Sequence, residues 1–155
     1  MISPELLRRF PFFNFCDDMQ LKAVAMLAEE VEVGPGTSLF ESEHRAVALY
    51  VMVDGRIDLN YKVIDHADPR IVKELFINEL NPGDIFGLSA LVEPYICPVT
   101  AKALAASQVI RLDARGLRAL SELDVKLQAG LMRATAKVAM DRLNATRTQL
   151  AAAQA

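Results

Sequence analysis

The sequence predicts a mainly β protein with flanking α-helices, in which the strands close into a barrel or jelly roll. Between residues 31 and 112 the pattern has period two, with turn signals about every eight to twelve positions. In residues 1–30 and 113–155 the apolar residues recur at helical spacing instead. The chain has 155 residues, 52% of them apolar, which suffices for one substantial core. We therefore expect a single domain over residues 1–155.

Two short helices are expected before the strands. Apolar residues follow helical spacing from Ser3 to Phe10 and again from Asp17 to Glu30, and Asp17 is a suitable N-cap. Four phenylalanines lie around Pro11, namely Phe10, Phe12, Phe13 and Phe15. We interpret this cluster as packed core and not as a ligand cage.

The strand region contains one strong local turn signal. Residues 47–53 and residues 57–63 alternate on either side of Asp54-Gly55, a dipeptide that favours a type I′ hairpin. These two segments are therefore expected to pair with each other. Further strands are expected around residues 31–33, 71–80, 99–105 and 108–112.

The last part of the chain predicts two helices. Asp113 can cap a short helix that runs through Leu120, and a long helix is expected from about Asp124 to Leu150. One apolar stripe of the long helix is suited to lying on the barrel: Leu127, Leu131, Ala134 and Val138.

A second stripe on the same helix has the 3.5-residue period of a coiled-coil seam. It consists of Met132, Ala136, Ala139, Leu143, Thr146 and Leu150. A single barrel has little surface left to cover this stripe, so we expect it to meet a second copy of the chain across a two-fold axis. The alternative is an intramolecular face that the N-terminal helices cover.

Charge and cysteine content narrow the class of protein. The net charge of −3 and the pI near 5.4 provide no field that would gather nucleic acid or an anionic membrane. The first residues lack a basic start followed by an apolar run, and the apolar stretches are interrupted by charge. Cys16 and Cys97 lie far apart and share no motif, which fits a reducing compartment. We expect a soluble cytoplasmic protein with no nucleic-acid or membrane partner.

Three segments together resemble the cyclic-nucleotide-binding domain family. They are residues 31–43, residues 49–59, and Pro-Gly-Asp-Ile-Phe-Gly at residues 82–87. The chain is most similar to the sensor domains of bacterial regulators related to catabolite activator protein and the fumarate-nitrate regulator. The resemblance implies a double-stranded β-helix, a jelly-roll-like β-roll, with a long C-terminal dimerisation helix. The helix-turn-helix that follows in such regulators has no counterpart before Ala155, so a stand-alone sensor domain and a piece of a longer regulator both remain open.

The family's phosphate-binding cassette corresponds to residues 79–104. In the family, a Glu after Phe-Gly accepts a hydrogen bond from the ribose 2′-hydroxyl, and an Arg about ten positions later pairs with the cyclic phosphate. Here Leu88 stands at the Glu position, and Cys97 or Pro98 stands at the Arg position. Losing one partner of such a charge pair costs about 2–5 kcal/mol, so tight binding of cyclic AMP is not expected.

The resemblance still implies a pocket around the cassette. Its candidate residues are Phe86, Gly87, Leu88, Ser89, Ala90, Cys97, Pro98, Val99, Thr100 and Thr146. Ser89 and Thr100 offer neutral hydrogen-bond donors, and Thr146 falls where activator-type regulators place a Thr that contacts the adenine. Lys102 or Arg45 could supply a replacement contact to a phosphate.

No other chemistry is indicated. The two histidines, His44 and His66, lie apart in turn-rich segments, which disfavours a metal or haem site. Cys97 lacks a neighbouring base that would activate its thiol. No catalytic residues stand out, and we expect no enzymatic activity.

Three hypotheses about function follow. The first is a sensor for a non-phosphate or apolar small-molecule effector, or for a weakly held nucleotide. The second is a dimerisation and interaction scaffold with an empty pocket, which acts through a protein partner. The third is a true cyclic-nucleotide receptor with a non-standard phosphate ligand.

Overall fold

Short, well-capped helices precede the strands in the computed structural model, which describes residues 1–155. Helix α1 (Pro4–Arg8) begins after Ser3, whose hydroxyl accepts a hydrogen bond from the backbone N–H of Glu5. Helix α2 (Asp18–Ala25) begins with a capping box that Asp17 and Gln20 form with each other's backbone N–H groups. The 3-10 turn η1 (Pro11–Phe13) lies between them and buries Phe12 and Phe13.

The second helix ends earlier than its sequence pattern predicts. Apolar spacing predicted a helix as far as Glu30, but α2 ends at Ala25 and strand β1 (Ala28–Val33) follows. Strand β1 pairs along its whole length with β8 (Ser107–Asp113). This ladder of backbone hydrogen bonds to a distant segment overrides the local helical pattern. The prediction of helices over all of residues 1–30 is therefore wrong at its C-terminal end.

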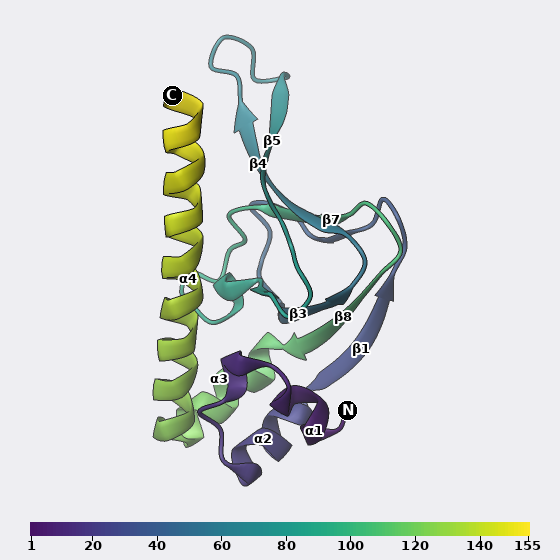
Figure 1. Ribbon diagram of the computed structural model, residues 1–155, viewed down its shortest axis with the longest axis vertical. Coiled ribbons are helices and arrows are strands. Elements are labelled where there is room, and N and C mark those ends of the chain that lie inside the picture. Colours follow the sequence, from purple (N-terminus) through teal and green to yellow (C-terminus); the bar gives the residue numbers. More distant parts are fainter.

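Eight strands form two four-stranded antiparallel sheets that face each other, which confirms the jelly-roll-like fold (Figure 1). The first sheet has the order β1, β8, β3 (Ala48–Asp54) and β6 (Ile85–Phe86). The second sheet has the order β2 (Ser38–Phe40), β7 (Thr100–Ala103), β4 (Ile57–Ile64) and β5 (Val72–Glu79).

The predicted hairpin at Asp54-Gly55 is wrong. Strand β3 pairs with β6 and β8, whereas β4 pairs with β5 and β7, so this turn carries the chain from one sheet to the other. The turn is fixed by contacts with Ser107 and not by a hairpin ladder. The Ser107 hydroxyl accepts the backbone N–H of Arg56, and Gly55, with φ of +99°, lies directly against the backbone of Ser107.

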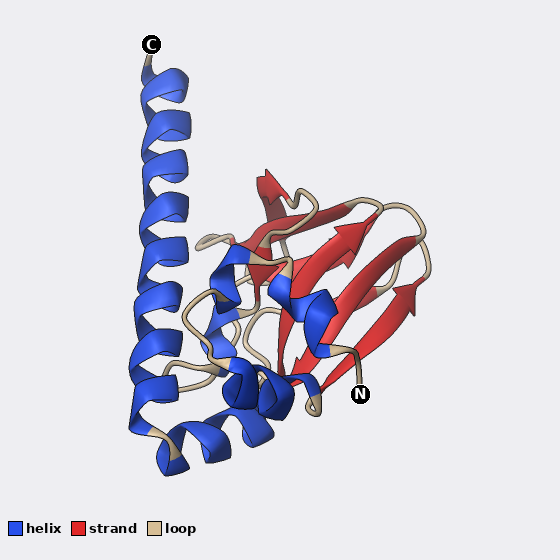
Figure 2. Cartoon of the chain, turned by 60° about the horizontal axis from the view of Figure 1, so that its bottom comes forward, coloured by secondary structure: helices blue, strands red, loops and turns tan.

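Strand β3 is buried on both faces. Leu49 and Val51 pack into a larger core that includes α2, α3 and the start of α4. Tyr50 and Met52 point the opposite way, into a smaller core between the two sheets. The inside of the roll is therefore filled, while the helices cover the outer face of the first sheet (Figure 2).

Two C-terminal helices complete the fold, which confirms the predicted cap at Asp113 and the predicted start of the long helix near Asp124. Helix α3 (Ala114–Leu123) begins at the N-cap Asp113, and helix α4 (Val125–Gln154) begins at the N-cap Asp124. Helix α4 stands beside the roll, with its C-terminal end next to the protruding β4–β5 hairpin (Figure 1). None of the helices combines the length and apolar character needed to cross a membrane.

The turn between the sheets provides a stability prediction. A Cβ atom at residue 55 would lie 2.5 Å from the Ser107 Cα, so Gly55→Ala adds a backbone clash to an unfavourable positive φ. We expect this change to lower the free energy of unfolding by roughly 3 kcal/mol or more, measured by urea denaturation. Gly36→Ala is the matched control, because Gly36 has φ of +84° with no atom within 4 Å of the added Cβ. Its cost should be only about 1 kcal/mol. Equal costs for the two variants would contradict the close packing of Gly55 on Ser107.

Candidate ligand-binding site

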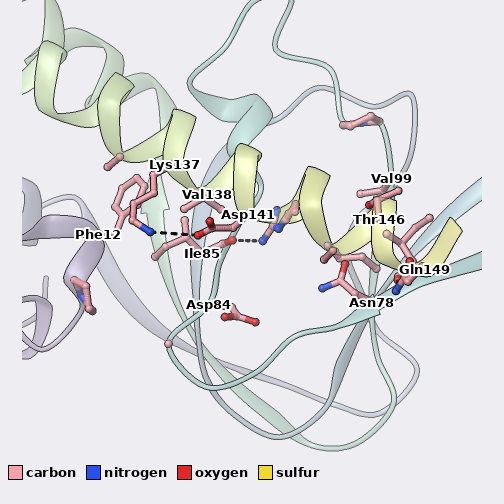
Figure 3. A pocket seen from close by; sticks show the side chains of 18 of the residues that line it. Phe12, Asn78, Asp84, Ile85, Val99, Lys137, Val138, Asp141, Thr146 and Gln149 are labelled. Atoms are coloured by element: carbon pink, nitrogen blue, oxygen red, sulfur yellow. Dashed lines mark hydrogen bonds and ion pairs between the residues drawn. The ribbon is translucent and has the colours of Figure 1, made fainter. Parts of the chain in front are cut away.

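A cavity of about 800 Å³ lies between the roll and helix α4. The roll contributes residues from β4, β5 and β6 and from the segment before β7, and the N-terminal turn η1 closes one end. Figure 3 shows the facing side chains, with Lys137, Val138, Asp141, Thr146 and Gln149 on α4 opposite Phe12, Asn78, Asp84, Ile85 and Val99.

Two side chains of α4 attach its C-terminal half to the roll across this cavity. The Arg142 guanidinium donates a hydrogen bond to the backbone carbonyl of Ile85, and the Gln149 side-chain amide donates to the carbonyl of Ile77 at 2.8 Å. The N-terminal half of α4 is held differently, because Leu127 and Leu131 are fully buried in the larger core. Apolar packing thus fixes one half of the helix, and hydrogen bonds to neutral carbonyls hold the other.

The two cations of the cavity differ in whether a carboxylate pairs with them. Lys137 and Asp141 form an exposed ion pair at 3.4 Å. Arg142 is half-buried, and burial lowers the pKa of its guanidinium, while the nearby Asp84 carboxylate partly opposes this shift. Asp84 itself accepts the backbone N–H of Asn81 at 2.7 Å. Arg142 is thus a half-buried cation whose direct partner is a neutral carbonyl.

The first part of the cassette serves as packing. Phe86 is fully buried inside the roll and stacks on Tyr50 with ring centroids 5.1 Å apart. Gly87 has φ of +76° and begins the 3-10 turn η2 (Leu88–Ala90). Leu88 packs against the larger core, in which Ala90 is fully buried, and Ser89 is half-buried. None of these residues lines the cavity.

The second part of the cassette divides between core and cavity. Cys97 is buried, its backbone N–H and C=O pair with the loop at His44 and Glu43, and burial raises the pKa of its thiol. Thr100 is also buried, and its hydroxyl accepts the backbone N–H of Ser42 at 3.1 Å. Pro98 and Val99 lie between them in sequence and line the cavity. Of the predicted pocket residues, the structure brings Pro98, Val99 and Thr146 together there.

The two predicted replacement cations lie elsewhere. Arg45 is exposed and forms a backbone bridge with Ile96. Lys102 lies on β7, and neither residue lines the cavity. Two cations on α4 do line it, Lys137 and Arg142, and the sequence pattern singled out neither. The helical spacing could have predicted that Arg142 faces the roll, because it lies one helical turn beyond Val138 on the roll-facing stripe. No three His, Cys, Asp or Glu side chains converge in the way that a metal ion would need.

The fold and the site together define the class of protein. The profile of the cyclic nucleotide-binding domain matches residues 30–124, and the chain belongs to this family. A structure of a protein from Geobacter metallireducens GS-15, described as a cyclic nucleotide-binding protein, is 31% identical, with a TM-score of 0.80. That alignment covers 92% of this chain and 99% of the other. No curated protein matches the chain.

More distant structures share the fold. The sensor domain of the transcriptional regulator DNR from Pseudomonas aeruginosa is 20% identical with a TM-score of 0.67, covering 90% of this chain and 92% of that one. A regulatory subunit of a cAMP-independent protein kinase A from Trypanosoma brucei is 16% identical with a TM-score of 0.72, covering 94% of this chain and 49% of that one.

Helix α3 holds the cassette from outside the cavity. The Arg118 guanidinium donates to the Ala90 carbonyl at 2.7 Å and lies 4.1 Å from the centroid of the Tyr95 ring. Since α3 leads directly into α4, this contact joins the cassette to the base of the long helix.

We expect Arg118→Met to lower the free energy of unfolding by about 1–2 kcal/mol, because it removes a charge-assisted hydrogen bond and a cation–π contact. Hydrogen exchange should accelerate across residues 88–95 in particular. Arg115→Met, at an exposed position of the same helix, is the control and should leave both measurements unchanged. Unaltered exchange in the Arg118 variant would show that the cassette does not depend on this contact.

Proposed function

We propose that the chain is a non-enzymatic sensor domain that binds a small-molecule effector in the cavity beneath α4. The observation that carries this proposal is the cavity itself, since one of its walls is a helix half that two hydrogen bonds to backbone carbonyls attach to the roll. A ligand that prefers one position of this helix would shift its population. The free cysteines, Cys16 and Cys97, fit action in the reducing cytoplasm.

Cyclic nucleotides are poor candidates for this effector. Leu88 is occupied in packing and offers no acceptor to a ribose, and neither Cys97 nor Pro98 offers a charge to a phosphate. The Trypanosoma brucei subunit is a useful parallel. It belongs to a cAMP-independent protein kinase A, and a triple mutant that includes a threonine-to-arginine change is bound to cAMP in its A site.

Calorimetry tests the cassette. Wild type should bind cyclic AMP and cyclic GMP no tighter than roughly hundreds of micromolar, because charge-assisted contacts are missing. Pro98→Arg should raise the affinity, since residue 98 lines the cavity, whereas residue 88 packs against the larger core and does not line it. Cys97→Arg is the comparison, and it should lose stability because residue 97 is buried. Sub-micromolar binding by wild type would refute the proposal of a weakened phosphate site.

We also propose that α4 joins two copies of the chain. The seam residues Met132, Leu143 and Leu150 have exposed fractions of 38%, 48% and 57%, and the intervening Ala136 and Ala139 are exposed as well. The N-terminal segment packs at Gly130 through Phe15, away from these side chains. Thr146 lies at the border of the seam and lines the cavity, so a dimer would bring the seam close to the ligand site.

Leu143→Asp should convert the dimer to a monomer, because it places a charge in the centre of an apolar seam worth several kcal/mol at about 25 cal/mol per Å². Sedimentation at tens of micromolar measures the change. Leu123→Asp is the matched control, since Leu123 is 86% exposed on α3 and lies outside the seam. A wild-type protein that sediments as a monomer at this concentration would rule out the seam.

One observation favours the scaffold as a second function. The β4–β5 hairpin exposes the apolar side chains Tyr61, Ile64, Val72, Leu75 and Phe76. An exposed apolar surface of this kind is typical of protein interaction sites. A scaffold would keep its partner when the cavity is filled by a large side chain, whereas a sensor would lose its response.

A further inference from the structure

Arg142 is the one cation of the cavity that no carboxylate pairs directly. Its neighbour Lys137 is paired with Asp141, whereas Arg142 donates only to the Ile85 carbonyl. Asp84 contributes an attractive field but is held by the Asn81 backbone and makes no ion pair with Arg142. A guanidinium has five N–H donors in a planar fork, so most of its hydrogen-bonding capacity is unused here.

We propose that Arg142 is the recognition group for an organic anion, a ligand with an apolar body and one carboxylate, sulfonate or phosphate group. This inference rests on the proposed function of the cavity and specifies the chemistry of its ligand. The anion would be bound from the α4 side of the cavity, by a residue outside the cassette.

The rest of the lining fits the body of such a ligand. Phe12, Leu59, Ile85, Val99 and Val138 provide apolar contacts, while Asn78 and Gln149 add neutral polar groups at one end. The volume of about 800 Å³ lies within the roughly 300–1,000 Å³ of sites for small organic molecules. A half-buried cation in these surroundings gains more from an anion than from a neutral carbonyl, because the anion adds charge–charge attraction and can accept two parallel hydrogen bonds from the planar guanidinium.

Binding at Arg142 would also act on α4. The guanidinium that binds the anion is the group that attaches the C-terminal half of α4 to Ile85. An anion that draws its N–H donors away from this carbonyl loosens the attachment, which leaves Gln149 and Ile77 as the remaining hydrogen-bonded link. Recognition of the ligand and movement of the helix are thus carried by the same side chain.

A pair of fluorescent probes tests this chemistry. Anilinonaphthalene sulfonate and phenyl-naphthylamine share the same apolar body, and only the first carries an anionic group. Wild type should bind the sulfonate more tightly than the neutral probe. Arg142→Met should weaken sulfonate binding roughly tenfold or more and leave the neutral probe unaffected. Arg142→Lys keeps the charge without the planar fork and should fall between the two. Arg133→Gln, at an exposed position of α4 that does not line the cavity, should bind both probes as wild type does.

Ala145→Trp tests whether the two probes bind in the cavity, because Ala145 lines the cavity and a large side chain there would fill it. Loss of both probes in this variant, with sulfonate binding sensitive to Arg142, supports the inference. If both probes bind in the cavity but Arg142→Met does not change the sulfonate affinity, the anion inference fails and the ligand cavity stands. If neither probe responds to Ala145→Trp, the ligand cavity fails and the inference with it. Binding of the neutral probe by the Arg142 variants also shows that they are folded.

Discussion

Burial of strand β3 on both faces is the constraint on which the rest of the structure depends. Leu49 and Val51 face the helices, and Tyr50 and Met52 face the opposite sheet. The stacked rings of Tyr50 and Phe86 lie in the core between the two sheets, and the edge of that core at Leu59 lines the cavity. The space for a ligand lies between the roll and α4, where Arg142 and Gln149 link the helix to backbone carbonyls of the roll.

This arrangement gives the two halves of α4 different strengths of attachment. Leu127 and Leu131 each contribute about 1.5–3 kcal/mol by full burial. In net terms the Gln149 hydrogen bond contributes only about 1 kcal/mol and the charge-assisted Arg142 bond about 1.5–3 kcal/mol, because both ends of each bond can bind water when separated, so together they hold the helix less firmly than the two buried leucines. Movement of the helix should therefore be confined to its C-terminal half, which carries the cavity wall and most of the proposed dimer seam. A sensor needs such an element, whose position a ligand of modest affinity can change.

Much of the fold could be predicted from the sequence, because caps and strand alternation are local signals. Asp17, Asp113 and Asp124 begin helices as expected, and the two-sheet roll follows from the period-two pattern. The sequence around Asp54-Gly55 could not show that this turn is not a hairpin, since β3 pairs with β8, a segment far away in the sequence. The site was predicted less well. The family resemblance predicts a site at the cassette, but most of the cassette is core. Arg142 is a charged residue that continues an apolar stripe, and a charged residue on a helix usually faces solvent.

Native mass spectrometry of the protein purified from its own source is the most direct test of a ligand in the cavity. Wild type should carry the added mass of one small organic anion per chain, and the mass should be absent from Ala145→Trp, in which the cavity is filled. The retained molecule should also be lost from Arg142→Met. An added mass that persists in Ala145→Trp, or wild-type protein that carries no small molecule, would contradict a sensor whose ligand lies beneath α4.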